Sequence, residues 1–364
     1  MKSIYILSSS ILFFVWACSS ENRSGAGAKP PITESLTLNN FVQSAPFQVI
    51  NIDGIDSIKI SLKEENIIYS VYQKLDDTDP ILGDIWDAIK VNNKIYVYDF
   101  SSKAIYSIDT KGEINGPFTR EGRGPGEHLG VGVIRANLKN IYATDPNNGR
   151  INRYTLDMKV LSSIPLQVLR TIELNNEILI FENNGISKEE NLLTITSVEN
   201  VYDTLATIMP RIVPIGYEPS LYNNLLFSVN SSGVVIASYS AFPWIFIFDD
   251  DYQHVQTLLF EYSSFDSLNV PEFKLEKKPS SKRYNLQRPF VYHRLMDNGD
   301  IYIGIEEELI YLTPDGEGKY KTRKILVEQF ENANNASIMV IGTSKDTVYA
   351  KNAKYLYDFT ISLD

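Results

Sequence analysis

Cysteine and histidine are nearly missing from this sequence. Cys18 is the only cysteine among 364 residues, which excludes an internal disulfide and a zinc site built on cysteines. The three histidines are His128, His254 and His293. Cationic side chains are in the minority, and the net charge is −11. Because a nucleic-acid site needs a basic patch to neutralise phosphates, this charge argues against a nucleic acid as partner.

The N-terminal apolar stretch is short for a membrane-spanning helix. It runs from Ile4 to Ala17, whereas a span needs ~20 apolar residues. It follows Lys2 and ends in a small residue, which is typical of a secretory signal. The four residues Val-Trp-Ala-Cys at 15–18 resemble the lipobox of bacterial lipoproteins, in which the cysteine is acylated and begins the mature chain. The alternative is an ordinary signal peptide in which Cys18 is incidental.

This resemblance divides the chain into three segments. We expect a signal peptide at 1–17, a flexible tether rich in Ser, Gly, Ala and Pro at 18–45, and a folded domain at 46–364. The residue after Cys18 is Ser19 rather than an aspartate. By analogy with other lipoproteins, this favours lipid anchoring at the outer membrane. The periplasmic side and the cell surface both stay open.

One hairpin pattern recurs six times after residue 80. A short polar turn rich in Asn and Gly joins two apolar runs, of which the second is rich in Ile, Val and Tyr. The copies are 90–99, 135–145, 172–182, 228–239, 294–304 and 340–351. A third strand is expected after each, at 104–109, 150–155, 191–196, 244–249, 309–313 and 355–360. A four-strand unit with a period near ~40–50 residues is typical of β-propeller blades.

The sequence therefore predicts an all-β fold, a six-bladed β-propeller of four-stranded antiparallel blades. A double β-sandwich does not explain why the same unit occurs six times. The sixth copy ends after its third strand, and an unpaired edge invites aggregation. Two N-terminal runs, PFQVINI (46–52) and SIKISL (57–62), could supply the missing strand. We expect one of them to form the outer strand of the last blade and to close the ring.

The pattern resembles the six-bladed propeller lipoproteins of Bacteroidetes, a family related to NHL-repeat and TolB-like propellers. The most specific part of the resemblance is REGRGPGE (120–127), which is similar to the family's "GRGPGE" signature after the first full blade. The resemblance covers nearly the whole mature chain. It implies the fold and the lipid anchor, and it implies little about activity, because most members of that family have no assigned function.

The glycine-rich stretch TREGRGPGEHLG (119–130) is expected to connect the first blade to the second. It is not a phosphate-binding P-loop, because no Lys-Ser or Lys-Thr follows the glycines. Its glycines and Pro125 suit a tight crossover, and this structural interpretation is favoured over direct ligand contact.

Any ligand is expected on the face of the propeller that carries this connection. Propeller connectivity places the turns between second and third strands on that same face, together with a long segment at 261–290 that contains six lysines and arginines. This basic segment could attract an anionic ligand or could be a solvated insertion. The predicted ligand-binding residues are Arg120, Arg123, Glu127, His128, Asp145, Trp244, Arg288, His293 and Arg294.

The sequence favours binding over catalysis. No G-x-S-x-G motif is present, and the spread of the three histidines over the chain argues against a three-histidine zinc site. A site of His128, His293 and a carboxylate, Glu127 or Asp145, stays open. We assign no catalytic residue, metal or cofactor. The leading hypothesis is an anchored binding or scaffolding protein for a carbohydrate, an anionic small molecule or another envelope protein. The alternative is a hydrolase or lyase that acts on a carbohydrate at the mouth of the propeller channel.

Overall fold

The computed structural model describes most of the chain after residue 40. The described residues are 41–71, 82–166, 171–182, 191–211, 223–240, 242–262, 290–305, 308–328, 338–344, 347–352 and 355–361. Cys18, Arg288 and nearly all of the basic segment 261–290 lie outside these ranges. Within the described ranges, no helix has the length and apolar character required to cross a membrane.

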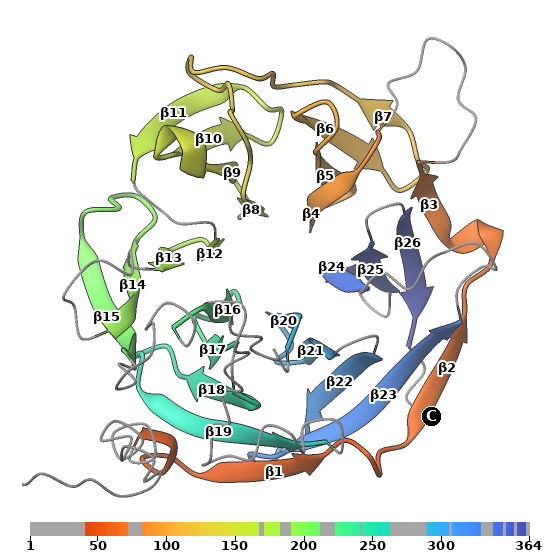
Figure 1. Ribbon diagram of the computed structural model, residues 1–364, viewed down its shortest axis with the longest axis vertical. Helices are drawn as coiled ribbons and strands as arrows, with labels where there is room; N and C mark the ends of the chain where they lie inside the picture. Colours follow the sequence, from red (N-terminus) through yellow and green to blue (C-terminus); the bar gives the residue numbers. More distant parts are fainter. Residues whose placement is uncertain are drawn as a thin grey trace, which may run out of the picture.

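Six antiparallel sheets form a ring around a central axis (Figure 1). Blade 1 contains β4 (Ile85–Val91), β5 (Lys94–Asp99), β6 (Ala104–Asp109) and β7 (Ile114–Asn115). Blade 2 contains β8 (Ile134–Ala136), β9 (Asn140–Asp145), β10 (Arg150–Thr155) and β11 (Val160–Pro165). Blade 3 contains β12 (Ile172–Leu174), β13 (Ile178–Glu182), β14 (Asn191–Ser197) and β15 (Thr204–Pro210).

The second half of the ring repeats this arrangement. Blade 4 contains β16 (Leu225–Val229), β17 (Val235–Tyr239), β18 (Trp244–Phe248) and β19 (His254–Glu261). Blade 5 contains β20 (Tyr292–Leu295), β21 (Ile301–Ile305), β22 (Glu308–Pro314) and β23 (Tyr320–Glu328). Blade 6 contains β24 (Met339–Ser344), β25 (Thr347–Lys351) and β26 (Tyr355–Thr360). The short 3-10 turns are η1 (Glu64–Asn66) and η2 (Pro146–Asn148). The predicted six-bladed propeller is confirmed.

An N-terminal strand closes the ring, but it is neither of the two runs expected from the sequence. The fourth strand of blade 6 is β3 (Ile67–Ser70), which pairs antiparallel with β26. The two expected donors pair elsewhere, and both pair in parallel. Strand β1 (Phe47–Asn51) adds a fifth strand to β19 of blade 4, and β2 (Ser57–Ser61) does so to β23 of blade 5. The N-terminal segment thus runs around the outside of blades 4 and 5 (Figure 1).

The hydrophobic core lies between the blades. The described buried residues form six clusters, and each cluster joins two neighbouring blades. Strands in such positions are covered on both faces, which explains the nearly continuous apolar runs such as KIYVYD in β5 and WIFIF in β18. Each fully buried Ile or Phe contributes about 1.5–3 kcal/mol through burial. Packing of every blade on its neighbours therefore holds the ring.

The folded part begins before the predicted boundary at residue 46. The ring of Phe41 lies 4.7 Å from the ring of His254, and Phe41 and Val42 pack against the core cluster between blades 3 and 4. The Oγ of Ser44 lies 2.9 Å from Nδ1 of His254. The end of the expected tether, from residue 41, is therefore attached to blade 4.

Candidate functional site

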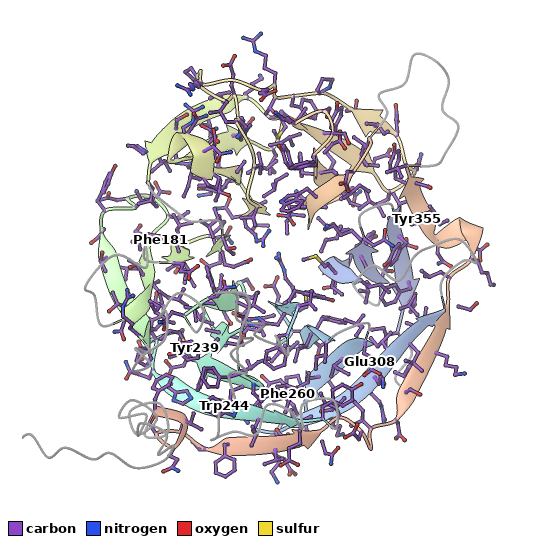
Figure 2. The ribbon with its side chains drawn as sticks, in the orientation of Figure 1. Phe181, Tyr239, Trp244, Phe260, Glu308 and Tyr355 are labelled. Atoms are coloured by element: carbon purple, nitrogen blue, oxygen red, sulfur yellow. The ribbon has the colours of Figure 1, made fainter. Side chains whose placement is uncertain are left out.

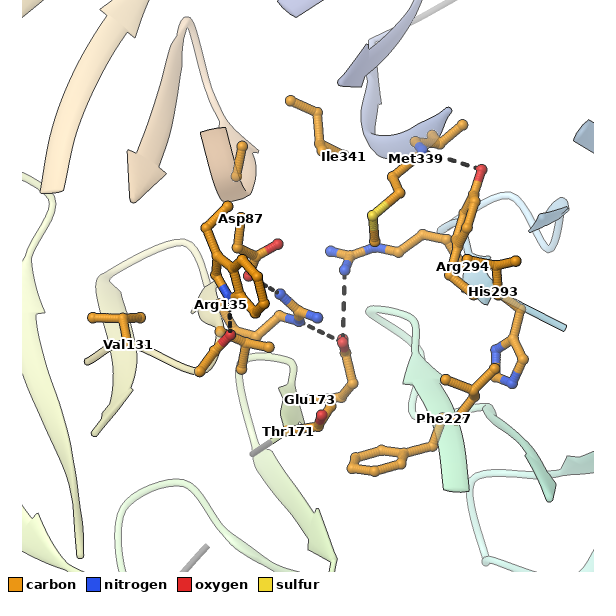
Figure 3. A pocket seen from close by; sticks show the side chains of 18 of the residues that line it. Asp87, Val131, Arg135, Thr171, Glu173, Phe227, His293, Arg294, Met339 and Ile341 are labelled. Carbon is orange, nitrogen blue, oxygen red and sulfur yellow. Dashed lines mark hydrogen bonds and ion pairs between the residues drawn. The ribbon is translucent and has the colours of Figure 1, made fainter. Parts of the chain in front are cut away.

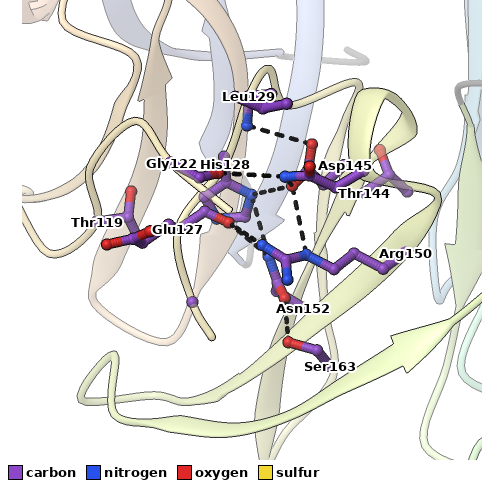
Figure 4. A network of polar contacts seen from close by, with 12 residues as sticks. Thr119, Gly122, Glu127, His128, Leu129, Thr144, Asp145, Arg150, Asn152 and Ser163 are labelled. Carbon is purple, nitrogen blue, oxygen red and sulfur yellow. Dashed lines mark hydrogen bonds and ion pairs between the residues drawn. The ribbon is translucent and has the colours of Figure 1, made fainter. Parts of the chain in front are cut away.

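Arg150 holds the glycine-rich connection on blade 2 (Figure 4). This arginine begins β10, and its guanidinium donates hydrogen bonds to three backbone carbonyls of the connection: Arg123 at 3.1 Å, Gly124 at 2.8 Å and Glu127 at 2.8 Å. Gly126 adopts a φ of +75°, which glycine reaches without the strain of a side chain. These contacts hold the connection on blade 2 without a ligand, and the backbone conformation accounts for the glycine at 126.

His128 lies beneath the same connection and is fully buried. Its Nε2 is 2.6 Å from the hydroxyl of Tyr154, which donates to the carbonyl of Gly126, and its Nδ1 is 3.3 Å from Nδ2 of Asn152. Burial lowers the pKa of His128 to about 4, although the nearby Asp145 carboxylate acts in the opposite direction. His128 is therefore neutral at pH 7, with both ring nitrogens next to protein partners.

Asp145 is also buried beneath the connection. Its carboxylate accepts hydrogen bonds from the backbone N–H of Leu129 and from the side chain of Asn148, and it lies 3.5 Å from Nε of Arg150. Asp99 ends β5 just as Asp145 ends β9. The carboxylate of Asp99 accepts hydrogen bonds from the backbone N–H groups of Gly83 and Asp84, in the segment that enters blade 1. This repetition indicates that the aspartate at the end of the second strand fastens the incoming chain.

Arg120 and Arg123 of the connection reach solvent, whereas the Glu127 carboxylate accepts a hydrogen bond from the backbone N–H of Gly124. The side chain of Arg120 is 83% exposed and forms an ion pair with Glu127 at 2.7 Å. Arg123 is exposed. Neither side chain ties the glycine-rich connection to blade 2, since Arg150 does so.

Trp244, one of the predicted ligand-binding residues, is buried in the core and offers no surface to a ligand. Trp244 begins β18 and is only 5% exposed, because its ring stacks on Phe242 at a centroid distance of 4.9 Å inside the cluster between blades 3 and 4 (Figure 2). The apolar character of WIFIF reflects this core position.

A cavity of about 730 Å³ opens at the mouth of the central channel (Figure 3). Its wall includes Gly130–Val133, directly after the glycine-rich connection, and η2, so it lies on the face expected from the sequence. Of the nine predicted ligand-binding residues, His293 and Arg294 line this cavity. The remaining lining comes mainly from the inner strands of the blades.

Four charged side chains from four inner strands meet in this cavity (Figure 3). They are Asp87 of β4, Arg135 of β8, Glu173 of β12 and Arg294 of β20. Nη1 of Arg135 donates to Asp87 at 2.9 Å, and Nε of Arg135 donates to Glu173. Nη1 of Arg294 lies 3.7 Å from the same Glu173 oxygen. Glu173 thus stands between the two guanidinium groups.

The two arginines differ in how well their charge is compensated. Burial alone would lower the pKa of Arg135, but the carboxylates of Glu173 and Asp87 outweigh it and raise that pKa. Burial lowers the pKa of Arg294, and Arg135 adds to this effect, against the attraction of Glu173. Among the described residues, the guanidinium of Arg294 forms this one ion pair and no side-chain hydrogen bond. Arg294 is therefore the less well compensated of the two cations.

His293 contributes no positive charge to the cavity. Its Nε2 lies 3.1 Å from Oγ of Ser238, and the residue is 6% exposed. Burial lowers the pKa of His293 to about 3, so the imidazole is neutral at physiological pH.

An exposed aromatic pair forms part of the cavity wall. Trp86 of β4 and Phe100 of the turn after β5 are 53% and 54% exposed, and their ring centroids are 5.6 Å apart. The indole N–H of Trp86 donates to the carbonyl of Gly132 at 3.0 Å. The ammonium of Lys351 donates to the carbonyl oxygens of Ile85 and Trp86, which fixes the backbone at the start of β4.

The opposite end of the channel holds a second cavity of about 460 Å³. The turns between first and second strands line it, including those at Asn92 and Asp297, and Arg294 lines both cavities. Several of its polar groups join neighbouring blades: Asn137 donates to the carbonyl of Asn175, and Asn175 donates to the carbonyl of Asn230. This end therefore already has structural partners for many of its amides.

The sequence analysis missed Trp86, Phe100, Asp87, Arg135 and Glu173. A signal for the last two was present, because the first strands of the second, third and fifth hairpin copies carry the charged residues Arg135, Glu173 and Arg294. First strands of propeller blades line the axis, so charges at these positions converge. No group of three or more metal-ligating side chains occurs within the described ranges.

The ring of six sheets around one axis defines a six-bladed β-propeller. The chain belongs to the DUF5128 family, described as a 6-bladed beta-propeller, whose family model matches residues 43–307. No curated protein matches the sequence.

A solved structure with a TM-score above 0.5 agrees with this fold. An exported protein from Bacteroides fragilis is similar with a TM-score of 0.55 at 15% identity, over 86% of this chain and 100% of that chain. The virginiamycin B lyase from Staphylococcus aureus has a TM-score of 0.42 at 11% identity, over 80% of this chain and 89% of the lyase. Identities this low concern the fold alone.

Proposed function

We propose that this protein is a binding protein of the cell envelope that takes a carbohydrate or a similar small ligand in the cavity at the channel mouth. The observation that carries the proposal is the pair Trp86 and Phe100. Large aromatic side chains normally bury most of their surface, yet these two are more than half exposed beside a cavity of about 730 Å³. Exposed aromatic surface next to convergent polar groups is characteristic of ligand sites.

A binding role fits the cavity better than hydrolysis or elimination does. Its two carboxylates, Asp87 and Glu173, both accept hydrogen bonds from Arg135. A general acid or base needs a carboxyl group within hydrogen-bond reach of the substrate, whereas both of these carboxylates already bind Arg135. The carboxylates therefore serve to position Arg135.

The proposed location is the outer membrane, through a lipid on Cys18. The support is the lipobox-like sequence at 15–18, and the structurally similar protein of Bacteroides fragilis is described as exported. Cys18→Ser should move the protein from the membrane fraction to the soluble fraction or leave its precursor uncleaved. Unchanged membrane partitioning and acyl labelling of this variant would contradict the anchor.

The binding proposal is tested by replacing the exposed aromatic ring. A thermal-shift screen against neutral and acidic oligosaccharides identifies ligands, whose affinities are then measured by calorimetry. Trp86→Ala should weaken binding about tenfold or more, as truncation of a central aromatic contact does. Phe47→Ala is the matched control, because Phe47 is 62% exposed but lies on β1 at the outer edge. Equal affinities of Trp86→Ala and the unmodified protein would place the ligand elsewhere.

A further inference from the structure

The charges in the channel-mouth cavity are unequally shared. Arg135 donates hydrogen bonds to both carboxylates, Asp87 and Glu173, and also to the carbonyl of Ile134. Asp87 accepts a further hydrogen bond from the backbone N–H of Ile134. Both carboxylates are therefore hydrogen-bonded to Arg135, and Glu173 forms only a longer ion pair with the second arginine, Arg294.

Arg294 occupies the other side of Glu173 and projects into the cavity (Figure 3). Its side chain is 19% exposed, so the guanidinium has lost most of its contact with water. Its partner in the described structure is the Glu173 oxygen at 3.7 Å, beyond ordinary hydrogen-bond length. A desolvated guanidinium without hydrogen bonds costs free energy that an anionic ligand group would recover.

We infer that the ligand of this cavity is an acidic sugar, whose carboxylate or phosphate binds Arg294 while its ring lies against Trp86 and Phe100. This inference rests on the proposed function and specifies its ligand class. The planar guanidinium matches the two oxygens of a carboxylate or phosphate, and the aromatic pair offers an apolar surface for the C–H face of a sugar ring. An uncharged apolar ligand would leave Arg294 with the long Glu173 ion pair alone.

Glu173 sets the strength of this anion site. It shares its charge between Arg135 and Arg294, and it repels an incoming anion. Replacing Glu173 by glutamine keeps the shape of the side chain and removes the negative charge. Anion affinity should therefore rise in Glu173→Gln and fall when Arg294 is changed, two effects of opposite sign at adjacent residues.

The experiment measures binding of three probes by calorimetry with the whole purified protein: D-glucuronate, glucose 6-phosphate and glucose. We expect at least one acidic probe to bind about tenfold more tightly than glucose. Comparing D-glucuronate with glucose 6-phosphate shows whether the site prefers a carboxylate or a phosphate. Arg294→Met should remove this preference, and Arg294→Lys should keep part of it because the charge remains. Arg120→Met is the matched control, since Arg120 is exposed and already paired.

Folding of the variants is checked by thermal denaturation. Arg294→Met removes a poorly compensated buried charge, so its melting temperature should stay equal or rise. The inference is overturned if glucose binds as well as the acidic probes, or if Arg294→Met keeps the preference for the acidic ones. Glucose binding that depends on Trp86 would leave the proposed function standing and reject only the acidic ligand. Absence of binding by every saccharide would reject both.

Discussion

Replacing Arg150 by methionine should destabilise the protein by about 3 kcal/mol, because the charge beside Asp145 is lost. Methionine keeps much of the length of the side chain, so the packing changes little. Loss of one partner from a buried ion pair costs about 3–5 kcal/mol, and Asp145 is fully buried. The two remaining hydrogen bonds to Asp145, from Leu129 and Asn148, keep the cost near the lower end of that range. The carbonyl of Glu127 keeps a hydrogen bond from Asn152, and the carbonyls of Arg123 and Gly124, which lose their donor, belong to residues that are not buried and can bind water.

The assay is urea unfolding followed by intrinsic fluorescence, with the free-energy change taken from the shift of the midpoint at constant slope. Arg120→Met serves as the control, because an ion pair with an 83% exposed arginine is worth at most about 1 kcal/mol. Arg150→Lys should lose less stability than Arg150→Met, because lysine keeps the positive charge beside Asp145. It should still lose some, because lysine lacks the planar guanidinium donors.

A loss of less than about 1 kcal/mol in Arg150→Met would refute the structural explanation of the glycine-rich connection. The same holds if Arg120→Met proves the more destabilising of the two. Either result would mean that the connection is held by contacts other than those of Arg150, and a ligand role for its glycines would then be favoured.

Two further predictions concern stability. Tyr69→Phe should cost about 1–3 kcal/mol in urea unfolding, because the Tyr69 hydroxyl accepts a hydrogen bond from the buried backbone N–H of Leu82, which would stay unpaired; an unchanged midpoint would contradict this. Stability should fall as pH is lowered from about 6.5 to about 4, by up to about 3 kcal/mol from His128 alone, because its folded pKa lies below the unfolded value and the unfolded chain takes up the proton first. His293 acts in the same direction, so His128→Gln should flatten the pH profile of unfolding only in part, and a profile identical to that of the unmodified protein would contradict the assignment.

The repeat and its strand positions could be predicted from the sequence because each blade carries its own pattern. Short polar turns and runs such as KIYVYD depend on neighbours a few residues away, and these local rules hold in every copy. The closing strand could not be identified in this way. The runs 46–52 and 57–62 alternate more clearly than Ile67–Ser70, yet alternation shows only that one face is exposed. A fifth strand on the outside of a blade has such a face, whereas the two central residues of β3, Ile68 and Tyr69, are both buried.

The sequence predicted the face of the propeller on which the candidate site lies, but few of the residues that line it. Propeller connectivity gave the face and the channel mouth, and it included His293 and Arg294. Trp244 was misassigned because a tryptophan in a strand has the same sequence signal whether it is buried or exposed. The partners Arg135 and Glu173 belong to different blades, and their contact depends on how the ring closes. Only the geometry of six packed blades brings them together.

The first three strands of the chain can pair only after the last three blades have been made. Strands β1, β2 and β3 pair with β19, β23 and β26, partners that follow more than 200 residues later. During synthesis or export, β1, β2 and β3 therefore stay unpaired until blades 4, 5 and 6 have been made. Contacts this distant in sequence form slowly and leave strand edges open in the meantime. A chain cut short before blade 4 would have no place for any of its first three strands, so the cell could recognise it by those unpaired edges.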